Sequence, residues 1–351
     1  MPLTRTSRAT PSRKKQHVNV TLTRDVAFKS KTTGLERLEF INNALPELDL
    51  SDVDTSTQFL NHTLKFPFMV SCMTGGYADA LKINRGLAEA CEEMQIAMGV
   101  GSQRQALENQ QYHKTFAVVR EVAKTIPVVG NIGAAEVATL NVEAAKRLIN
   151  LVKADALVVH LNPLQEFLQP EGNPRFRGVL AGIDRLVKGL SVPIIVKEIG
   201  AGISVDVARR LLDVGVRYID VAGAGGTSWA GVETIRRGVG RKVASRFWDW
   251  GIPLSLALHD LAQLRTDGHS FTLLASGGIS SGLDVAKCIA LGADIAASAR
   301  LFLVTLHKRG KRGLEELLNT WGEELRGVMF LTGSATIADL KRAPLVRYET
   351  P

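Results

Sequence analysis

Two glycine-rich segments have the composition of a phosphate-binding site. Residues 223–228 read Gly-Ala-Gly-Gly-Thr-Ser after an apolar run at 217–221, and residues 277–279 follow a second apolar run at 271–275. Glycine lets backbone N–H groups approach an anion closely because it has no Cβ, and a helix N-terminus adds its dipole. Thr227 and Ser228 add hydroxyl donors. Either segment alone is equally consistent with a tight turn, but the two together favour phosphate binding.

Lys197 ends a run, Ile194-Ile195-Val196, that should be buried. A buried ammonium group is costly unless an anion or a polarisable ring lies beside it. A salt bridge with Glu198 is one explanation, although adjacent residues of a strand point to opposite faces. The other explanation is that Lys197 faces an anionic flavin or a substrate carbonyl.

A third group of polar residues, His160, Asn162, Gln165 and Glu166, lies around Pro163 at the end of another apolar run. A single carboxylate does not hold Mg²⁺ alone, but Mg²⁺ commonly takes one carboxylate together with substrate phosphates and water. Glu166 is therefore a candidate magnesium ligand for a phosphorylated substrate, and Arg104 with the basic N-terminal residues would complete an anion pocket.

The elements that position these groups can be read from eight short apolar runs, at 67–73, 96–100, 127–131, 156–161, 193–197, 217–221, 271–275 and 293–297. Continuous apolar runs are typical of parallel strands buried on both faces. Helical spacing lies between them, for example at 79–94, 141–153, 205–214 and 284–291. Eight strand–helix units predict an α/β fold, a (β/α)8 TIM barrel, whose active site lies at the carboxyl ends of the strands. An open doubly wound sheet is the alternative.

We expect three segments: an N-terminal arm and pre-barrel segment at 1–66, the catalytic barrel at 67–333 and a C-terminal tail at 334–351. The charge is concentrated in the arm. Residues 1–31 carry eight basic residues and one acid, and the whole chain has a net charge of +8. A solvated tail, a transit peptide and an arm that folds over an anionic ligand all fit such a segment. The phosphate-binding motifs favour the last.

Composition excludes several classes of protein. The three cysteines are widely spaced without a CxxC pair, which argues against a disulfide framework or zinc site and favours a reducing, cytoplasmic compartment. No apolar run reaches about 18 residues, so we expect no membrane segment. The chain has no Walker loop or HExxH motif. The body outside the arm is nearly neutral, which argues against nucleic-acid binding.

Taken in order, these motifs resemble the flavin-dependent, type 2 isopentenyl-diphosphate isomerases, from about Arg13 to Arg300. The motifs are Arg13-Lys14 with His17, Met73-Thr74-Gly75-Gly76, Gly101-Ser102-Gln103-Arg104, Asn131-Ile132-Gly133, His160-Leu161-Asn162 with Gln165-Glu166, Lys197-Glu198, Gly225-Gly226-Thr227-Ser228-Trp229, Asp249-Trp250-Gly251-Ile252-Pro253 and Ser276-Gly277-Gly278-Ile279.

The resemblance implies conversion of isopentenyl diphosphate to dimethylallyl diphosphate, with reduced FMN, NADPH as reductant and Mg²⁺. It implies FMN contacts at Met73, Thr74, Gly75, Ser102, Asn131, Lys197, Thr227, Gly277, Gly278, Ile279, Ala299 and Arg300. It implies diphosphate contacts at Arg13, Lys14, His17 and Arg104, a magnesium ligand at Glu166, a substrate contact near the alkene at Gln165, and a proton-relaying carboxylate near the flavin at Glu233. We expect catalytic roles for Gln165 and Glu233, and also for His160, because Glu233 and His160 are the evident acid–base candidates among these residues. The resemblance also implies a homo-oligomer, a tetramer or octamer.

The sequence departs from the family pattern at Gln16, where an acid is expected, and at Leu254, where threonine is common. An FMN-dependent 2-hydroxy-acid oxidase on the same barrel is the alternative function. It would need a histidine and an arginine to hold a carboxylate and take its proton. The Gln165-Glu166 pair and the basic arm argue against it.

Overall fold

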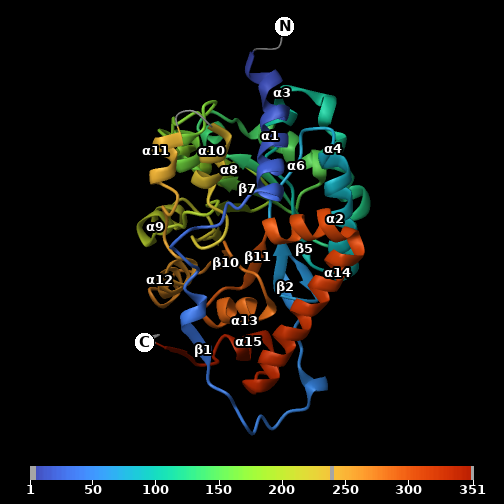
Figure 1. Ribbon diagram of the computed structural model, residues 1–351, viewed down its shortest axis with the longest axis vertical. Coiled ribbons are helices and arrows are strands. Elements are labelled where there is room, and N and C mark those ends of the chain that lie inside the picture. The colour runs from blue at the N-terminus through green and yellow to red at the C-terminus, as the bar shows by residue number, and fades with distance from the viewer. Residues whose placement is uncertain (1–4, 238–240, 349–351) are drawn as a thin grey trace.

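The computed structural model describes residues 5–237 and 241–348 (Figure 1). Eight parallel strands close into a barrel in the order β10-β11-β4-β5-β6-β7-β8-β9. Their bounds are β4 Phe68–Val70, β5 Ala97–Gly99, β6 Val128–Gly133, β7 Ala156–His160, β8 Ile194–Lys197, β9 Tyr218–Asp220, β10 Thr272–Ser276 and β11 Ile295–Ser298. Each overlaps one of the eight apolar runs, so the predicted TIM barrel is confirmed.

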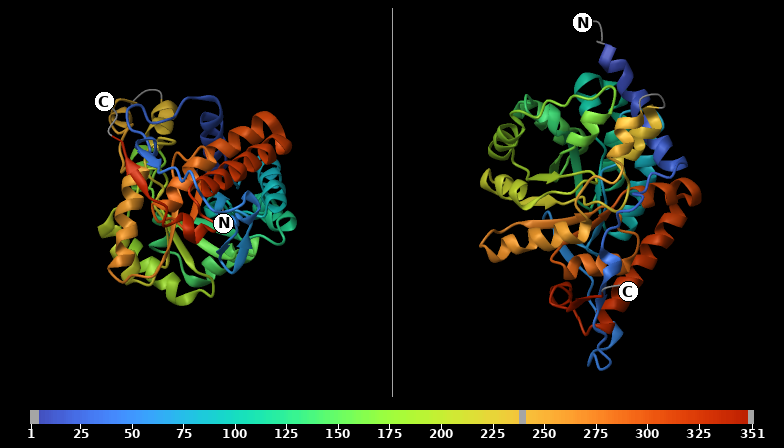
Figure 2. Two further views of the ribbon diagram at one scale, coloured as in Figure 1. Left: turned by 90° about the horizontal axis from the view of Figure 1, so that it is seen from below. Right: turned by 60° about the vertical axis from the view of Figure 1, so that its left-hand side comes forward.

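Eight helices follow these strands and surround the barrel (Figure 2). They are α2 Ala80–Met94, α4 Lys114–Val122, α6 Val142–Val152, α8 Val179–Gly189, α9 Val205–Asp213, α12 Leu254–Thr266, α13 Gly282–Ala290 and α14 Arg300–Leu331. Helix α14 contains a kink at Gly310, whose φ of 68° is not helical. Short helices lie in the loops between strands and helices: α3 Arg104–Glu108, η3 Gln110–Tyr112, α5 Ala134–Val137, α7 Pro163–Leu168, α10 Trp229–Arg237 and α11 Arg241–Arg246.

The barrel interior is filled by side chains and closed at one end by a hairpin. Alternate strand residues such as Met69, Val129 and Ile195 form one buried cluster inside the barrel. The hairpin of β2 Thr57–Phe59 and β3 His62–Leu64 adds Phe59 and Leu64 to that cluster. The remaining strand side chains pack outward against the helices in a second, larger core. Burial on both faces explains why each strand is a continuous apolar run.

The pre-barrel segment and the C-terminal segment meet below the barrel. Strand β1 (Leu38–Phe40) pairs antiparallel with β12 (Leu345–Arg347), and α15 (Ile337–Leu340) packs against α13. Two short 3-10 helices, η1 Leu35–Arg37 and η2 Leu50–Asp52, lie in the same pre-barrel segment. The division at residues 66 and 333 stays a prediction, but both outer segments pack on the barrel.

Helix α1 (Arg5–Thr23) lies at the opposite end, across the carboxyl ends of the strands (Figure 1). It packs against α10, α14 and α3. We predicted an arm that folds over an anionic ligand and named no helix in it; the segment has no clear apolar face. Its order comes from contacts with the barrel, which can override weak local preference. Among the described residues, no helix has the length and apolar character needed to cross a membrane.

Candidate active site

A cavity of about 510 Å³ lies at the carboxyl ends of the barrel strands, beneath α1. The site residues predicted from the sequence line it, except Glu233 and Ser228. Those that line it are Arg13, Lys14, His17, Met73, Thr74, Gly75, Ser102, Arg104, Asn131, His160, Gln165, Glu166, Lys197, Thr227, Gly277, Gly278, Ile279, Ala299 and Arg300. The prediction that Ser228 offers a hydroxyl to a phosphate is wrong, because its side chain is buried and its Oγ donates to the carbonyl of Trp248 at 2.6 Å. The closed barrel therefore brings together residues from every part of the chain.

The two glycine-rich segments meet backbone to backbone at one side of the cavity. Gly277 has a φ of 105°, and a Cβ there would lie 2.0 Å from the carbonyl oxygen of Gly223. A Cβ on Gly226 would lie 2.4 Å from the amide nitrogen of Gly278. Only glycine allows this approach. The close packing explains the composition of both turns.

This glycine cradle presents free hydrogen-bond donors. Within residues 5–237 and 241–348, the amides of Gly277, Gly278, Ile279 and Ala299 donate to no protein acceptor. Helix α14 begins at the adjacent Arg300, so the positive end of its dipole faces the same place. Unpaired amides beside a helix N-terminus suit a phosphate group.

Lys197 is buried at the end of β8 and does not pair with the carboxylate of Glu198. Its Nζ donates to the backbone carbonyl of Glu198 at 2.6 Å. The Glu198 carboxylate turns away and accepts from three successive amides, those of Ile199, Gly200 and Ala201. Among the described residues, Lys197 and Glu198 therefore form no side-chain ion pair. The ammonium group of Lys197 is thus left at the wall of the cavity.

His160 is held neutral in the cavity wall. Its Nδ1 lies 2.8 Å from Oδ1 of Asn131, whose amide nitrogen donates to the carbonyl of Val100. The Asn131 oxygen must accept, so Nδ1 carries the proton and Nε2 is an acceptor. Burial, with the charges of Lys197 and Lys14, lowers the pKa of His160 to about 3. His160 is therefore a poor proton donor or base near neutral pH.

The Glu166 carboxylate is fixed by its neighbours at the start of α7. Nδ2 of Asn162 donates to Oε1 at 2.9 Å, and Gln169 Nε2 and the Asn173 amide donate to Oε2. Oδ1 of Asn162 is buried and has no partner in the described chain. Among residues 5–237 and 241–348, no group of three or more His, Cys, Asp or Glu side chains could hold a metal ion. A divalent ion at Glu166 would thus need oxygens from substrate and water.

Basic side chains gather on the side of the cavity under α1. Lys14 donates to the carbonyls of Gly75 at 2.8 Å and Ser102 at 2.5 Å. Burial, helped by the charge of Arg13, lowers the pKa of Lys14 to about 7. Arg104 pairs with Glu136 at 2.8 Å. Glu136, which the sequence analysis missed, follows the end of β6 by three residues, and burial raises its pKa.

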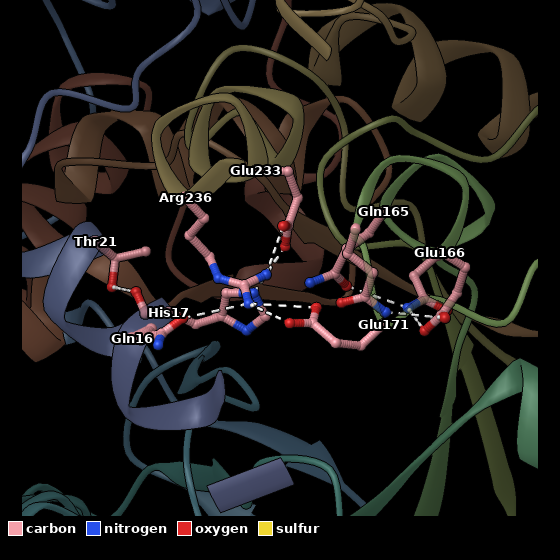
Figure 3. Close-up of polar contacts among 10 residues, drawn as sticks. Gln16, His17, Thr21, Gln165, Glu166, Glu171, Glu233 and Arg236 are labelled. Carbon is pink, nitrogen blue, oxygen red and sulfur yellow. Dashed lines mark hydrogen bonds and ion pairs between the residues drawn. The ribbon is translucent and has the colours of Figure 1, made fainter. Parts of the chain in front are cut away.

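Glu233 lies behind the cavity wall. Its carboxylate is held between His17 and Arg236, and its side chain is fully buried (Figure 3). Any contact with a ligand in the cavity must therefore pass through another residue. Arg236 was also missed, although its position three residues after Glu233 places both on one helix face.

The segment after α1 passes over the glycine cradle. A Cβ on Gly225 would lie 2.3 Å from the amide nitrogen of Thr33, so the segment touches the cradle. The Asp249 carboxylate accepts from the amides of Lys29 and Ser30, and from the Ser30 hydroxyl. We call residues 24–33 the strap. No role for Asp249 was predicted from the motif at 249–253, and in the structure its carboxylate holds the strap.

These features fit a flavin mononucleotide. The cavity is within the usual size of a ligand pocket, one end offers the free amides of a phosphate cradle, and a lysine lies in its wall. Nδ2 of Asn131 and the hydroxyl of Thr227 add polar groups at the barrel mouth.

Comparison with known proteins agrees with this geometry. The family model described as FMN-dependent dehydrogenase matches residues 6–143 and 159–347. The chain is 47% identical to the isopentenyl-diphosphate delta-isomerase of Chlorobaculum parvum over 350 residues, covering 96% of this chain and 97% of that protein. It is 44% identical to the enzyme of the same name from Pseudescherichia vulneris over 344 residues, covering 97% and 98%.

Solved structures with the same fold include a flavocytochrome b2 variant, with a TM-score of 0.68, 19% identity and coverage of 94% of this chain and 82% of that one. Another is mandelate oxidase with (S)-2-phenylpropionate, with a TM-score of 0.63, 20% identity and coverage of 97% and 98%. At sequence identities of 19% and 20%, the similarity to these structures shows only that the fold is shared. The sequence matches are more specific: the chain belongs to the FMN-dependent dehydrogenase family and, within it, to the isopentenyl-diphosphate delta-isomerases of type 2.

Proposed function

We propose that this protein converts isopentenyl diphosphate to dimethylallyl diphosphate. The observation that carries the proposal is that one cavity holds two anion sites. The glycine cradle lies at the ends of β9, β10 and β11, and the basic residues Arg13, Lys14 and Arg104 line the same cavity from α1 and α3. One site suits the phosphate of FMN, and the other suits the diphosphate of the substrate.

FMN would be held by the residues already placed around the cavity. Gly277, Gly278, Ile279 and Ala299 offer their amides to its phosphate. Lys197 offers a positive charge near the ring system, where a cation can stabilise an anionic reduced flavin. Reduced FMN would supply a group that can give a proton to one carbon and accept one from another, which a weakly basic alkene requires.

The diphosphate would lie between α1 and Glu166. Arg13 and Arg104 provide guanidinium groups that bind phosphate in two-point fashion. Glu166 would hold Mg²⁺ with the diphosphate oxygens and water. The diphosphate takes no part in the chemistry, but the binding energy that it provides can position the alkene.

The three residues proposed for catalysis have different positions. Gln165 is buried at the cavity wall, where its Oε1 accepts from Asn162 at 3.1 Å, so its amide group can orient the alkene end. His160 offers Nε2 only as a hydrogen-bond acceptor. Glu233 can influence a proton in the cavity only through His17, to which it is bonded at 2.7 Å.

We also propose NADPH as the reductant of the flavin, a homo-oligomer (a tetramer or octamer) as the assembled form, and a cytoplasmic location. The family membership supports these proposals. Both histidines of the cavity wall, His160 and His17, have a lowered pKa because they are buried, and Nε2 of His17 is held by Glu233. This argues against the alternative function of a 2-hydroxy-acid oxidase, which needs a histidine base.

The deciding experiment supplies isopentenyl diphosphate to FMN-loaded protein with Mg²⁺ and NADPH under anaerobic conditions. Dimethylallyl diphosphate should form, and should not form when the FMN stays oxidised or Mg²⁺ is chelated. A folded, reduced, FMN-loaded protein that makes no product contradicts the proposal. Turnover of a 2-hydroxy acid in air would then support the alternative.

A further inference from the structure

Helix α1 is joined to α10 by a buried chain of polar contacts (Figure 3). His17 Nε2 lies 2.7 Å from one oxygen of Glu233, and Arg236 Nη1 donates to the other oxygen at 2.6 Å. The second guanidinium nitrogen of Arg236 reaches Glu171 at 3.3 Å and Gln16 at 3.4 Å. The Arg236 side chain is only 6% exposed. The contacts therefore run from the cavity wall at His17 to the partly exposed Glu171.

The charge state of Glu233 determines how His17 is held. Burial acts to raise the pKa of Glu233, but the hydrogen bonds and charges of His17 and Arg236 outweigh it, so the pKa lies below its ordinary value. An ionised carboxylate only accepts hydrogen bonds, so Nε2 of His17 carries a proton. Nδ1 is then an acceptor in the neutral ring and a donor in the charged ring. His17 must gain a proton before Nδ1 can donate to a diphosphate oxygen.

We propose that Arg236 is a positioning residue for substrate binding, which holds Glu233 against His17 and contacts Gln16, so that α1 is fastened over the cavity, while Glu171 in the α7–α8 loop holds Arg236 itself. A guanidinium group suits this place because its N–H groups point in several fixed directions and can serve Glu233, Glu171 and Gln16 together. An ammonium group is a single point charge and cannot span these partners. Removing the cation leaves the buried Glu233 carboxylate with His17 as its remaining partner, which is unfavourable.

The charged groups that act on His17 are Glu233 and Arg236 on α10 and Arg13 on α1 itself. Lys14 on α1, Arg104 on α3 and Arg300 at the start of α14 are the other charged residues of the cavity wall on α1 and on the helices packed against it. Burial lowers the pKa of His17 most strongly, the contact with Glu233 opposes this, and the charges of Arg236 and Arg13 lower it further. Loss of the Arg236 charge should therefore raise the pKa of His17.

This inference rests on the proposed function. Its test measures the affinity for isopentenyl diphosphate as well as the formation of product. Calorimetry would measure the affinity of the FMN-loaded protein for isopentenyl diphosphate between about pH 5 and about pH 8, the range in which histidine changes charge. Wild type should bind less tightly as His17 loses its proton and, at about pH 7, as Lys14 loses its own; the part of this loss that is absent in His17→Asn belongs to His17. Arg236→Gln should weaken binding by about tenfold or more and move this loss of affinity to higher pH. Arg236→Lys should also weaken binding but leave the pH dependence near that of wild type, because the charge remains.

Two controls separate a positioning role from a general loss of structure. Arg246→Gln removes an exposed arginine of α11 and should change neither affinity nor its pH dependence. In a His17→Asn background, Arg236→Gln should cost no more than about twofold, since the two residues act together. FMN content and melting temperature would be measured for every variant.

The inference is overturned if folded Arg236→Gln binds isopentenyl diphosphate as tightly as wild type does. It is also overturned if Arg236→Gln lowers the affinity by the same factor in the wild-type and the His17→Asn backgrounds. If Arg236→Gln does not fold, Arg236→Lys decides, and wild-type affinity in that variant overturns the inference. A wild type that binds isopentenyl diphosphate with this pH dependence but yields no product contradicts the proposed function alone.

Discussion

Lys14 on helix α1 donates to the carbonyl oxygen of Gly75, 2.8 Å away and 61 residues later in the chain. Gly75 belongs to the loop after β4 that we assign to the flavin, and Lys14 belongs to the helix that we assign to the diphosphate. The contact therefore joins the two halves of the proposed site. It also removes the ammonium group from water, with a measurable consequence.

The first prediction concerns this lysine. Burial lowers the pKa of Lys14 to about 7, so its positive charge is present below that pH and lost above it. Because the charged form attracts the diphosphate, kcat/KM should fall as pH rises through about 7. Lys14→Arg should move the fall to higher pH, and Lys14→Met should lower kcat/KM at acidic pH by about tenfold. An unchanged profile in Lys14→Arg would show that another group titrates.

The second prediction concerns the metal. Glu166→Gln keeps the size of the side chain but removes the charge that would hold Mg²⁺. Activity should drop by about 100-fold or more at a fixed Mg²⁺ concentration and recover in part when Mg²⁺ is raised. FMN content should stay at the wild-type level, because the glycine cradle lies on other strands. Wild-type dependence on Mg²⁺ in this variant would place the ion elsewhere.

The third prediction concerns the glycine cradle. Gly277→Ala would place a Cβ 2.0 Å from a backbone oxygen and force a φ of 105° on an alanine. The variant should lose most of its FMN, measured as the ratio of flavin to protein absorbance. Gly327→Ala in α14 is the matched control, because a Cβ there meets nothing within 4 Å, and it should stabilise the helix by about 0.5–1 kcal/mol. A folded Gly277→Ala protein with full FMN would contradict the assignment of the cradle.

The fourth prediction concerns the strap at 24–33. Asp249→Asn leaves one carbonyl oxygen where a carboxylate accepts three hydrogen bonds from Lys29 and Ser30. The strap should open more often, and FMN should dissociate about tenfold faster in a stopped-flow exchange with apoprotein acceptor. Asp267→Asn, at an exposed site on the far end of α12, should leave the rate unchanged. Equal rates for both variants would mean that the strap does not limit FMN release.

Much of this protein can be predicted from its sequence. Parallel strands buried on both faces are continuous apolar runs, so eight runs indicated the barrel and located its strands. The glycines at 225–226 and 277–278 could be recognised because only glycine allows two backbones to approach so closely. Lys197 stood out because a charge at the end of a buried run requires a partner. Glu166 stood out because a single carboxylate can hold Mg²⁺ together with substrate phosphates and water.

Only the tertiary structure decided the rest. Helix α1 has no apolar face of its own, and the contacts that order it come from α3, α10 and α14, far along the chain. The same is true of the link from His17 to Glu233, which spans 216 residues. Sequence spacing reports which residues share a strand or helix face, because that depends on local geometry. It does not report which side chains from separate elements meet, because that depends on how the closed barrel places its loops.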